Sequence, residues 1–282
     1  MPNNSVLPLG MMVQNQPSKA IVLAVTSGKG GVGKSNIALN LAICLASAGK
    51  RIVLIDADLS TGNLDILMNI KSKYNISHII SGVRTIKEIT HVGLNGMEVI
   101  CGVSGLESIA NLNQFQHQRL INEFEQLESD CDTIIIDTGA GIDKKVVGFC
   151  LACDNAIVVT TPEPTAMTDA YSMIKVLVNN DFLGRISLVV NMAYSMEEGK
   201  KVHKQIATVA RHFLNTDIYE AGTVLQDEKL RSAVRRRRPV VIEYPRSAAS
   251  SAFIAMASRL SRTNVTPDNK KGFMAKVVNW FF

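Results

Sequence analysis

Residues 26–35 constrain the fold of this chain more than any other segment. They read Thr-Ser-Gly-Lys-Gly-Gly-Val-Gly-Lys-Ser, after the apolar run 20–25 and before the helix-forming run 36–42. Glycines let the backbone N–H groups of such a loop point inward around a phosphate, and the N-terminus of the next helix adds the positive end of its dipole. A strand, a glycine-rich loop and a helix in this order predict a phosphate-binding P-loop.

The loop gives individual residues a predicted role. Lys34 is expected to reach the β- and γ-phosphates of a nucleoside triphosphate, and the Ser35 hydroxyl is expected to ligate Mg²⁺. The residues of this loop predicted to contact the nucleotide are Gly28, Lys29, Gly30, Gly31, Val32, Gly33, Lys34, Ser35 and Asn36.

Carboxylates follow two further apolar runs. Residues 51–58 end in Asp56 and Asp58, residues 133–137 end in Asp137, and both runs are typical of buried parallel strands. Because parallel strands present their carboxyl ends to the ligand crevice, these acids should converge on the P-loop. Mg²⁺ takes carboxylates directly or through water, and hydrolysis needs a group that positions the attacking water. We therefore predict a site for ATP and Mg²⁺; capping of the strand ends is the structural alternative for the acids.

Apolar runs of strand length alternate with helical patterns along most of the chain. This order predicts an α/β fold with a mostly parallel sheet and helices on both faces. We expect one domain over residues 20–262, preceded by a flexible polar arm (1–19) and followed by a linker (263–271) and a short helix (272–282).

The five cysteines lie mostly in apolar segments, and no secretory signal precedes the first strand. We therefore expect a reducing cytoplasm. Cys150 and Cys153 form one CxxC motif without a second pair at metal spacing, which favours a buried pair on a helix. A metal cluster shared across a dimer is the alternative.

Two other features allow more than one interpretation. Asn191 ends an apolar run, and its amide could donate to and accept from an adenine edge, or it could simply form a turn. The run Arg235–Arg238, in a chain of net charge +5, could contact the phosphates of DNA. A solvated face or a dimer rim would also account for it.

Lys29 adds a second lysine to the P-loop, which resembles the deviant P-loop of the MinD/ParA ATPases. The resemblance implies that Lys29 crosses a homodimer interface to the partner's nucleotide, whereas a solvated charge is the plain alternative. It also implies that Asp58 positions water, that Asp137 holds the water shell of Mg²⁺, and that Asp56 supports the metal. Residues 59–65 and 138–143 would be the two switches that sense the γ-phosphate.

Four more segments, residues 137–142, 163–171, 191–193 and 244–250, resemble the flagellar-number regulators of the FlhG and FleN group. That resemblance implies ATP hydrolysis, ATP-dependent homodimerisation and membrane recruitment. It also implies protein partners, namely the flagellar GTPase FlhF and, in some members, a flagellar transcription activator. A ParA-like DNA-partitioning ATPase is the second candidate. A non-hydrolysing adaptor of a transcription activator is the third, and the presence of Asp58 argues against it.

The C-terminal segment is predicted to reach the membrane. Phe273, Val277, Trp280 and Phe281 fall on one side of a helix that lysines flank. Basic residues beside tryptophan and phenylalanine are typical of a helix that lies at an anionic membrane surface, here the inner face of the cell membrane. Docking of the helix on its own domain is the alternative.

Overall fold

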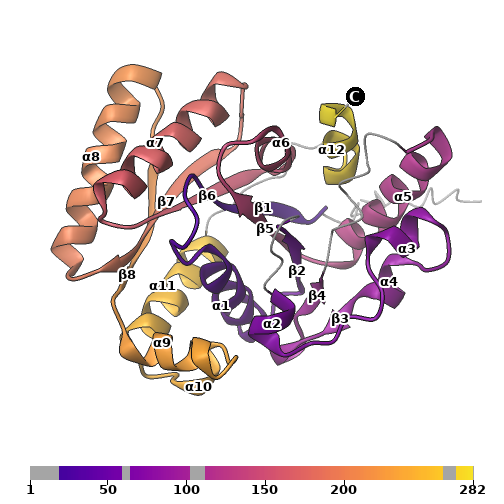
Figure 1. Ribbon diagram of the computed structural model, residues 1–282, viewed down its shortest axis with the longest axis horizontal. Helices are drawn as coiled ribbons and strands as arrows, with labels where there is room; N and C mark the ends of the chain where they lie inside the picture. Colours follow the sequence, from indigo (N-terminus) through magenta and orange to yellow (C-terminus); the bar gives the residue numbers. More distant parts are fainter. Residues whose placement is uncertain (1–18, 59–63, 102–111, 263–270, 282) are drawn as a thin grey trace, which may run out of the picture.

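The computed structural model describes residues 19–58, 64–101, 112–262 and 271–281. Within them, eight strands form one sheet in the order β3-β4-β2-β5-β1-β6-β7-β8 (Figure 1). Every neighbouring pair is parallel except β3 and β4, which are antiparallel. The strands are β1 (Ile21–Ser27), β2 (Ile52–Ala57), β3 (His91–Val92), β4 (Glu98–Ile100), β5 (Thr133–Ala140), β6 (Asn155–Thr160), β7 (Arg185–Ala193) and β8 (Tyr219–Leu225). The predicted α/β class is confirmed.

Helices cover both faces of the sheet. Alternate residues of β1 explain this: Val22 and Ala24 belong to one apolar cluster, and Leu23 and Val25 belong to the other. The first cluster takes in α3 (Ile76–Ile80), α4 (Ile86–Ile89), α5 (Gln114–Asp130), α6 (Lys144–Ala152), α7 (Pro164–Asn179), α8 (Met196–Leu214) and α12 (Phe273–Phe281). The second takes in α1 (Lys34–Ser47), α2 (Leu64–Met68), α9 (Glu228–Arg235), α10 (Val240–Glu243) and α11 (Ala248–Arg262).

The strand order brings the predicted site together. β5 lies between β1 and β2, so the strand that leads into the P-loop and the two strands that carry carboxylates are neighbours. Asp56 and Asp137 are direct partners in the β2–β5 register. The carboxyl ends of these three strands therefore meet at one edge of the sheet.

The sequence prediction missed the smallest elements. The helices α3, α4 and α10 have five residues or fewer, and β3 has two, so none is long enough to establish a periodic pattern. Lys19, assigned to the flexible arm, is in fact held by an ion pair to Glu128 at 2.9 Å. Residues 1–18 and 263–270 lie outside the described residues, so the rest of the predicted arm and nearly all of the predicted linker stay predictions.

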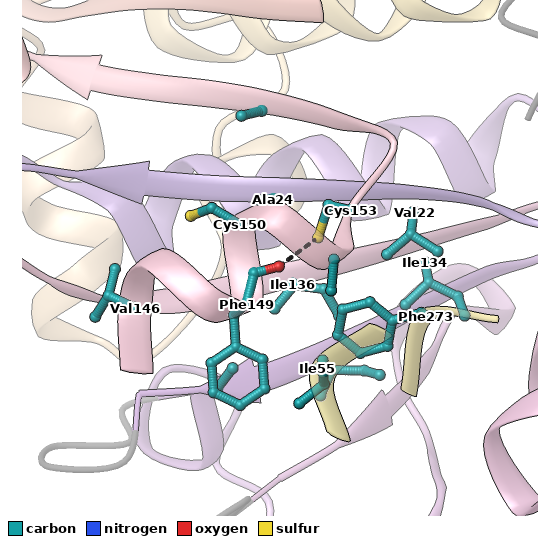
Figure 2. Packing of buried hydrophobic residues seen from close by; sticks show 14 of the residues in the cluster. Val22, Ala24, Ile55, Ile134, Ile136, Val146, Phe149, Cys150, Cys153 and Phe273 are labelled. Carbon is teal, nitrogen blue, oxygen red and sulfur yellow. Dashed lines mark hydrogen bonds between the residues drawn. The ribbon is translucent and has the colours of Figure 1, made fainter. Parts of the chain in front are cut away.

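The C-terminal helix α12 packs against α5 and α6 (Figure 1). Phe273 and Val277 are buried in the core, and the rings of Phe273 and Phe124 lie 6.1 Å apart between centroids. Figure 2 shows Phe273 beside Ile134 and Ile136 of β5. The alternative of docking on the same domain is therefore the arrangement found. Two of the four residues predicted to face the membrane, Phe273 and Val277, face the protein instead.

Polar contacts fix both ends of α12. At its start, the Phe273 N–H donates to Glu128 Oε1 at 2.7 Å, and Glu128 also pairs with Lys19. Near its end, Trp280 Nε1–H donates to the Lys144 carbonyl at 3.2 Å. Trp280 sits over Gly148, where an added Cβ would lie only 2.2 Å from the indole. The side chain of Phe281 lies outside the described part of the chain.

The cysteine pair is buried. Cys150 belongs to α6 and Cys153 follows its last residue, with the Cys153 thiol donating to the Phe149 carbonyl at 3.2 Å (Figure 2). Burial raises the pKa of Cys150 to about 12, so this thiol stays protonated at neutral pH. These are the properties of an apolar packing pair.

None of the helices in the described residues is both long enough and apolar enough to span a membrane.

Candidate functional site

Glycines shape the loop between β1 and α1. Gly31 and Gly33 have φ angles of +79° and +89°, in the left-handed region that side chains rarely adopt. An added Cβ at Gly33 would lie 2.3 Å from Asn191 Nδ2, and one at Gly28 would lie 2.0 Å from the Asp169 carbonyl oxygen. Gly33 thus allows the loop to pack directly against the end of β7. Gly28 does not line the cavity described below but packs against α7.

Lys34 is the first residue of α1, and its side chain contacts Asp137. Its side chain is only 8% exposed, and Nζ lies 3.4 Å from Asp137 Oδ1. Burial raises the pKa of Asp137, while the Lys34 charge and a hydrogen bond from Ser35 act in the opposite direction. The loop lysine, the loop serine and the acid at the end of β5 form one cluster, as the strand order requires.

Asp56 is almost fully buried beside this cluster. It accepts hydrogen bonds from the backbone N–H groups of Asp58 at 3.1 Å and Leu64 at 3.2 Å. Burial, reinforced by repulsion from Asp137, raises the pKa of Asp56 to about 6. Because Asp56 and Asp137 repel each other when both are ionised, a bound cation near them would be favourable.

Asp58 follows β2 and lines the cavity. A Cβ placed on Gly139 of β5 would lie 3.6 Å from Asp58 Oδ1, so this carboxylate adjoins the start of the predicted second switch. The predicted first switch falls largely on residues 59–63, outside the described residues.

The acids do not form a complete metal site by themselves. In the described part of the chain, no group of three or more His, Cys, Asp or Glu side chains is arranged to hold a metal ion. Mg²⁺ usually binds through one or two carboxylates, waters and the phosphates of a substrate. The residues present therefore fit a Mg²⁺ ion that arrives with a nucleotide. Ser35 lines the cavity and is bonded to Asp137, and Asp56 lies beside Asp137, so these three are the groups that could support the ion.

A cavity of about 590 Å³ adjoins the P-loop. The loop and Asp58 line part of it. The remaining walls come from the end of β7, from the end of β8 with the two residues after it, and from one face of α9, namely Asn191, Met192, Leu225, Gln226, Asp227, Leu230, Arg231, Val234 and Arg235. The volume suits a nucleotide, with its phosphates at the loop and its base against the walls that β7, β8 and α9 provide.

Asn191 provides a test of that fit. Its side chain is buried, and Nδ2 donates to the Val32 carbonyl at 2.8 Å. Its Oδ1 is also buried and has no hydrogen-bond partner within the described residues. Since an unsatisfied buried acceptor costs free energy, a ligand that donates a hydrogen bond here, such as an adenine amino group, would remove the cost.

Lys29 binds within its own chain. Its Nζ lies 2.9 Å from Glu163 Oε2 and 2.9 Å from Thr165 Oγ1, at the start of α7. The pair is exposed, so its net contribution to stability is small. Lys29 is therefore a partly solvated charge held by an exposed pair, and it can exchange these partners at little cost.

Sequence reasoning missed the residues after β8. They complete the wall of the cavity, and the rule that drew attention to β2 and β5 applies to them equally, because β8 is also parallel. Asp227 follows β8 much as Asp58 follows β2, so an acid at a strand end was the signal that could have identified this segment.

Comparisons with known proteins agree with this geometry. A family model described as ParA, NUBPL iron-transfer P-loop NTPase, matches residues 19–261. The antiactivator FleN of Pseudomonas aeruginosa is 36% identical over 90% of this chain and 90% of its own. The flagellum site-determining protein YlxH of Helicobacter pylori is 35% identical over 77% of this chain and 73% of its own.

A solved structure shares the fold. The septum site-determining protein MinD of Pyrococcus horikoshii, complexed with Mg-ADP, superposes with a TM-score of 0.70 at 20% identity. The match covers 86% of this chain and 96% of that one.

Proposed function

This chain belongs to the ParA family of P-loop NTPases and is related to FleN and MinD, and we propose that it is an ATP-gated homodimeric membrane switch that regulates flagellar number or placement. One observation supports a link between the nucleotide and the tail. Helix α6 begins directly after residues 138–143, the predicted second switch, and it also contacts the C-terminal helix α12. Asp143 caps the N-terminus of α6, and Lys144, the next residue, accepts the hydrogen bond from Trp280. A change at the γ-phosphate would thus reach the tail through a single short helix.

The proposed chemistry is ATP hydrolysis. Lys34 would donate to the β- and γ-phosphates, and Asp58 would hold the attacking water. When bound, Mg²⁺ supplies neutralisation of the charge on the phosphates. Asp137, which Lys34 contacts at 3.4 Å, would support the water shell of the Mg²⁺ ion.

Dimerisation is proposed to occur across the face of the cavity. Lys29 would leave Glu163 and Thr165 for the partner's nucleotide. Two exposed apolar side chains lie at or near this face: Ile66 lines the cavity and is 49% exposed, and Ile142, two residues after the cavity residue Ala140, is 48% exposed. Apolar groups beside a polar site favour an interface with another protein.

Membrane binding is proposed to require release of α12. The helix buries Phe273 and Val277 against its own domain, so these side chains can enter lipid only after it leaves. Each released tail would bind an anionic surface weakly. Two tails on one dimer would bind together, which turns two marginal affinities into stable attachment.

The flagellar role is supported by the two relatives, FleN and YlxH, whose names describe flagellar or antiactivator functions. The proposed protein partners are those that the sequence resemblance implies, the flagellar GTPase FlhF and a flagellar transcription activator, and the word antiactivator in the name of FleN supports the second. The proposed location is the cytoplasm, at the inner face of the membrane.

The chain contains a built-in reporter for this proposal, because Trp280 is its single tryptophan. Trp280 emission and sedimentation with anionic liposomes would be measured together, in a non-hydrolysable ATP analogue and in ADP. We expect a dimer, a changed Trp280 environment and pelleting in the analogue only. Lys29→Ala should bind nucleotide but stay monomeric, docked and unpelleted.

Gly148→Ala supplies the converse test. Its methyl group would collide with the Trp280 indole while leaving every tail side chain intact. In ADP this variant should show an exposed Trp280 and pellet with liposomes more than the wild type does, but less than the wild-type dimer in the analogue, because a monomer offers a single tail. A chain cut after Thr266 should not pellet at all. A wild-type protein that stays monomeric in the analogue, or a truncated chain that still pellets, would refute the switch. Turnover stimulated by DNA without lipid binding would favour a partitioning ATPase.

A further inference from the structure

The four consecutive arginines at 235–238 are not equivalent in the structure. Arg236 and Arg238 pair with Glu243 of α10, at 3.0 and 3.6 Å. Arg237 has a φ of +55° in the turn after α9 and does not line the nucleotide cavity. Arg235, the last residue of α9, lines that cavity and has no carboxylate partner among the described residues. Within the run, Arg236 and Arg238 therefore form ion pairs, Arg237 forms a turn, and Arg235 lines the cavity.

The face of α9 that forms this wall consists of Leu230, Arg231, Val234 and Arg235. Residues spaced by three and four positions share one side of a helix, so two aliphatic and two basic side chains form a single strip. Arg231 is already paired with Glu228 at 2.7 Å, which leaves Arg235 as the unpaired cation of the strip within the described part of the chain.

Several contacts fix this strip relative to the end of β7, the strand that carries Asn191. The Gln226 N–H donates to the Ala193 carbonyl at 2.9 Å, which ties the start of α9 to the end of β7. Asp227 caps α9 through Lys229 N and also accepts from Ala249 N at 3.0 Å, which ties it to α11. The Arg236–Glu243 pair holds the other end of the helix.

We propose that Arg235 is a nucleotide-specificity residue that contacts the base and ribose of bound ATP, with Leu230 and Val234 as the apolar floor. A planar guanidinium stacks on an aromatic ring better than an ammonium does and can donate to ribose oxygens at its edge. The phosphates already have Lys34 and the rest of the loop. This inference rests on the proposed ATP binding and adds the residue that recognises the nucleoside part.

Calorimetric titrations with Mg-ADP and with inorganic tripolyphosphate separate the two ends of the ligand. Arg235→Ala should weaken Mg-ADP binding roughly three- to thirtyfold, the range expected for one cation–π contact that becomes desolvated. It should change tripolyphosphate binding less than about twofold. Arg235→Lys keeps the charge but loses most stacking, so it should remain weakened for Mg-ADP.

Arg237→Ala is the matched control, since it removes the same charge two residues away and outside the cavity. It should leave both affinities within about twofold of the wild type. Arg235 is exposed, so its variants should fold, and their melting temperatures would check this.

Equal Mg-ADP affinity in Arg235→Ala and the wild type would overturn the inference. So would an equal loss of Mg-ADP and tripolyphosphate affinity, which would assign Arg235 to the phosphates. Loss of duplex DNA binding with unchanged nucleotide affinity would assign the residue to DNA instead. If the wild type itself fails to bind Mg-ADP, the proposed function fails first, so the two failures are distinguishable.

Discussion

The nucleotide site and the α12 groove differ in how far each is complete within a single chain. In the site, buried polar groups lack partners or oppose one another: Asn191 Oδ1 has no donor in the described residues, and Asp56 lies beside Asp137. In the groove between α5 and α6 that holds α12, Phe273 and Val277 are fully packed. Burial raises the pKa of Glu128 there, but this carboxylate is paired with Lys19 and accepts from the Phe273 N–H. The site therefore contains unfavourable interactions that a bound ligand would relieve. The groove, by contrast, is already occupied by α12 of the same chain.

This contrast predicts that mutations in the two regions affect different properties. Side chains of the groove should contribute to stability and little to chemistry. Side chains of the site should contribute to chemistry and little, or negatively, to stability. Three variants test this division, in order of decreasing effect.

Phe273→Ala should have the largest effect. Truncation of a buried phenylalanine costs about 3–5 kcal/mol, and here the cost falls on docking of α12 rather than on the whole fold. Trp280 emission should shift to that of an exposed indole, and protease should cleave the tail faster, with Mg-ADP affinity unchanged. Asn279→Ala, on the exposed side of the same helix, is the control and should keep the tail docked. An unchanged Trp280 spectrum in Phe273→Ala would mean that the groove does not hold the tail.

Asp58→Ala should have the next largest effect, and it should change only the rate of ATP hydrolysis. Without the group that positions water, the rate of ATP hydrolysis should fall at least about tenfold, equivalent to about 1.4 kcal/mol of barrier. Nucleotide affinity and ATP-dependent dimerisation should persist, and the nucleotide-free tail should stay docked. Steady-state phosphate release and light scattering measure these properties. Wild-type turnover in the variant would remove Asp58 from its proposed role.

Asp56→Asn should have the smallest effect and the opposite sign. The pKa of Asp56 is raised from 3.8 to about 6, so its ionisation destabilises the nucleotide-free fold above that pH and has no such cost below about 4. A shift of about two pKa units corresponds to about 3 kcal/mol in the free energy of unfolding. The asparagine amide accepts the Leu64 N–H less well than the carboxylate does, which offsets about 1 kcal/mol of this gain. We expect the variant to be more stable by roughly 1–2 kcal/mol at pH 8 and not at pH 4, as measured by denaturant unfolding. Equal or lower stability at pH 8 would contradict the view that the site stores unfavourable charge.

Much of the phosphate end of the site could be predicted from the sequence. The P-loop, the strands before it and the acids at 56, 58 and 137 are local patterns, and a parallel sheet brings strand ends together whatever the details of packing. Boundaries of short elements such as α10 could not be predicted, because four residues do not establish a period.

The sequence by itself therefore determined the α/β class, the phosphate-binding loop and the convergence of the carboxylates on it. Only the tertiary structure decided which arginine of the 235–238 run lines the cavity, since that depends on how α9 is tied to β7 and α11. It also decided where the tail lies, because an amphipathic helix has the same pattern whether its apolar side meets lipid or protein. The hydrophobic effect is non-directional, so the sequence does not specify what an apolar helix face packs against. Only the structure showed that α12 packs between α5 and α6, where Gly148 leaves room for Trp280.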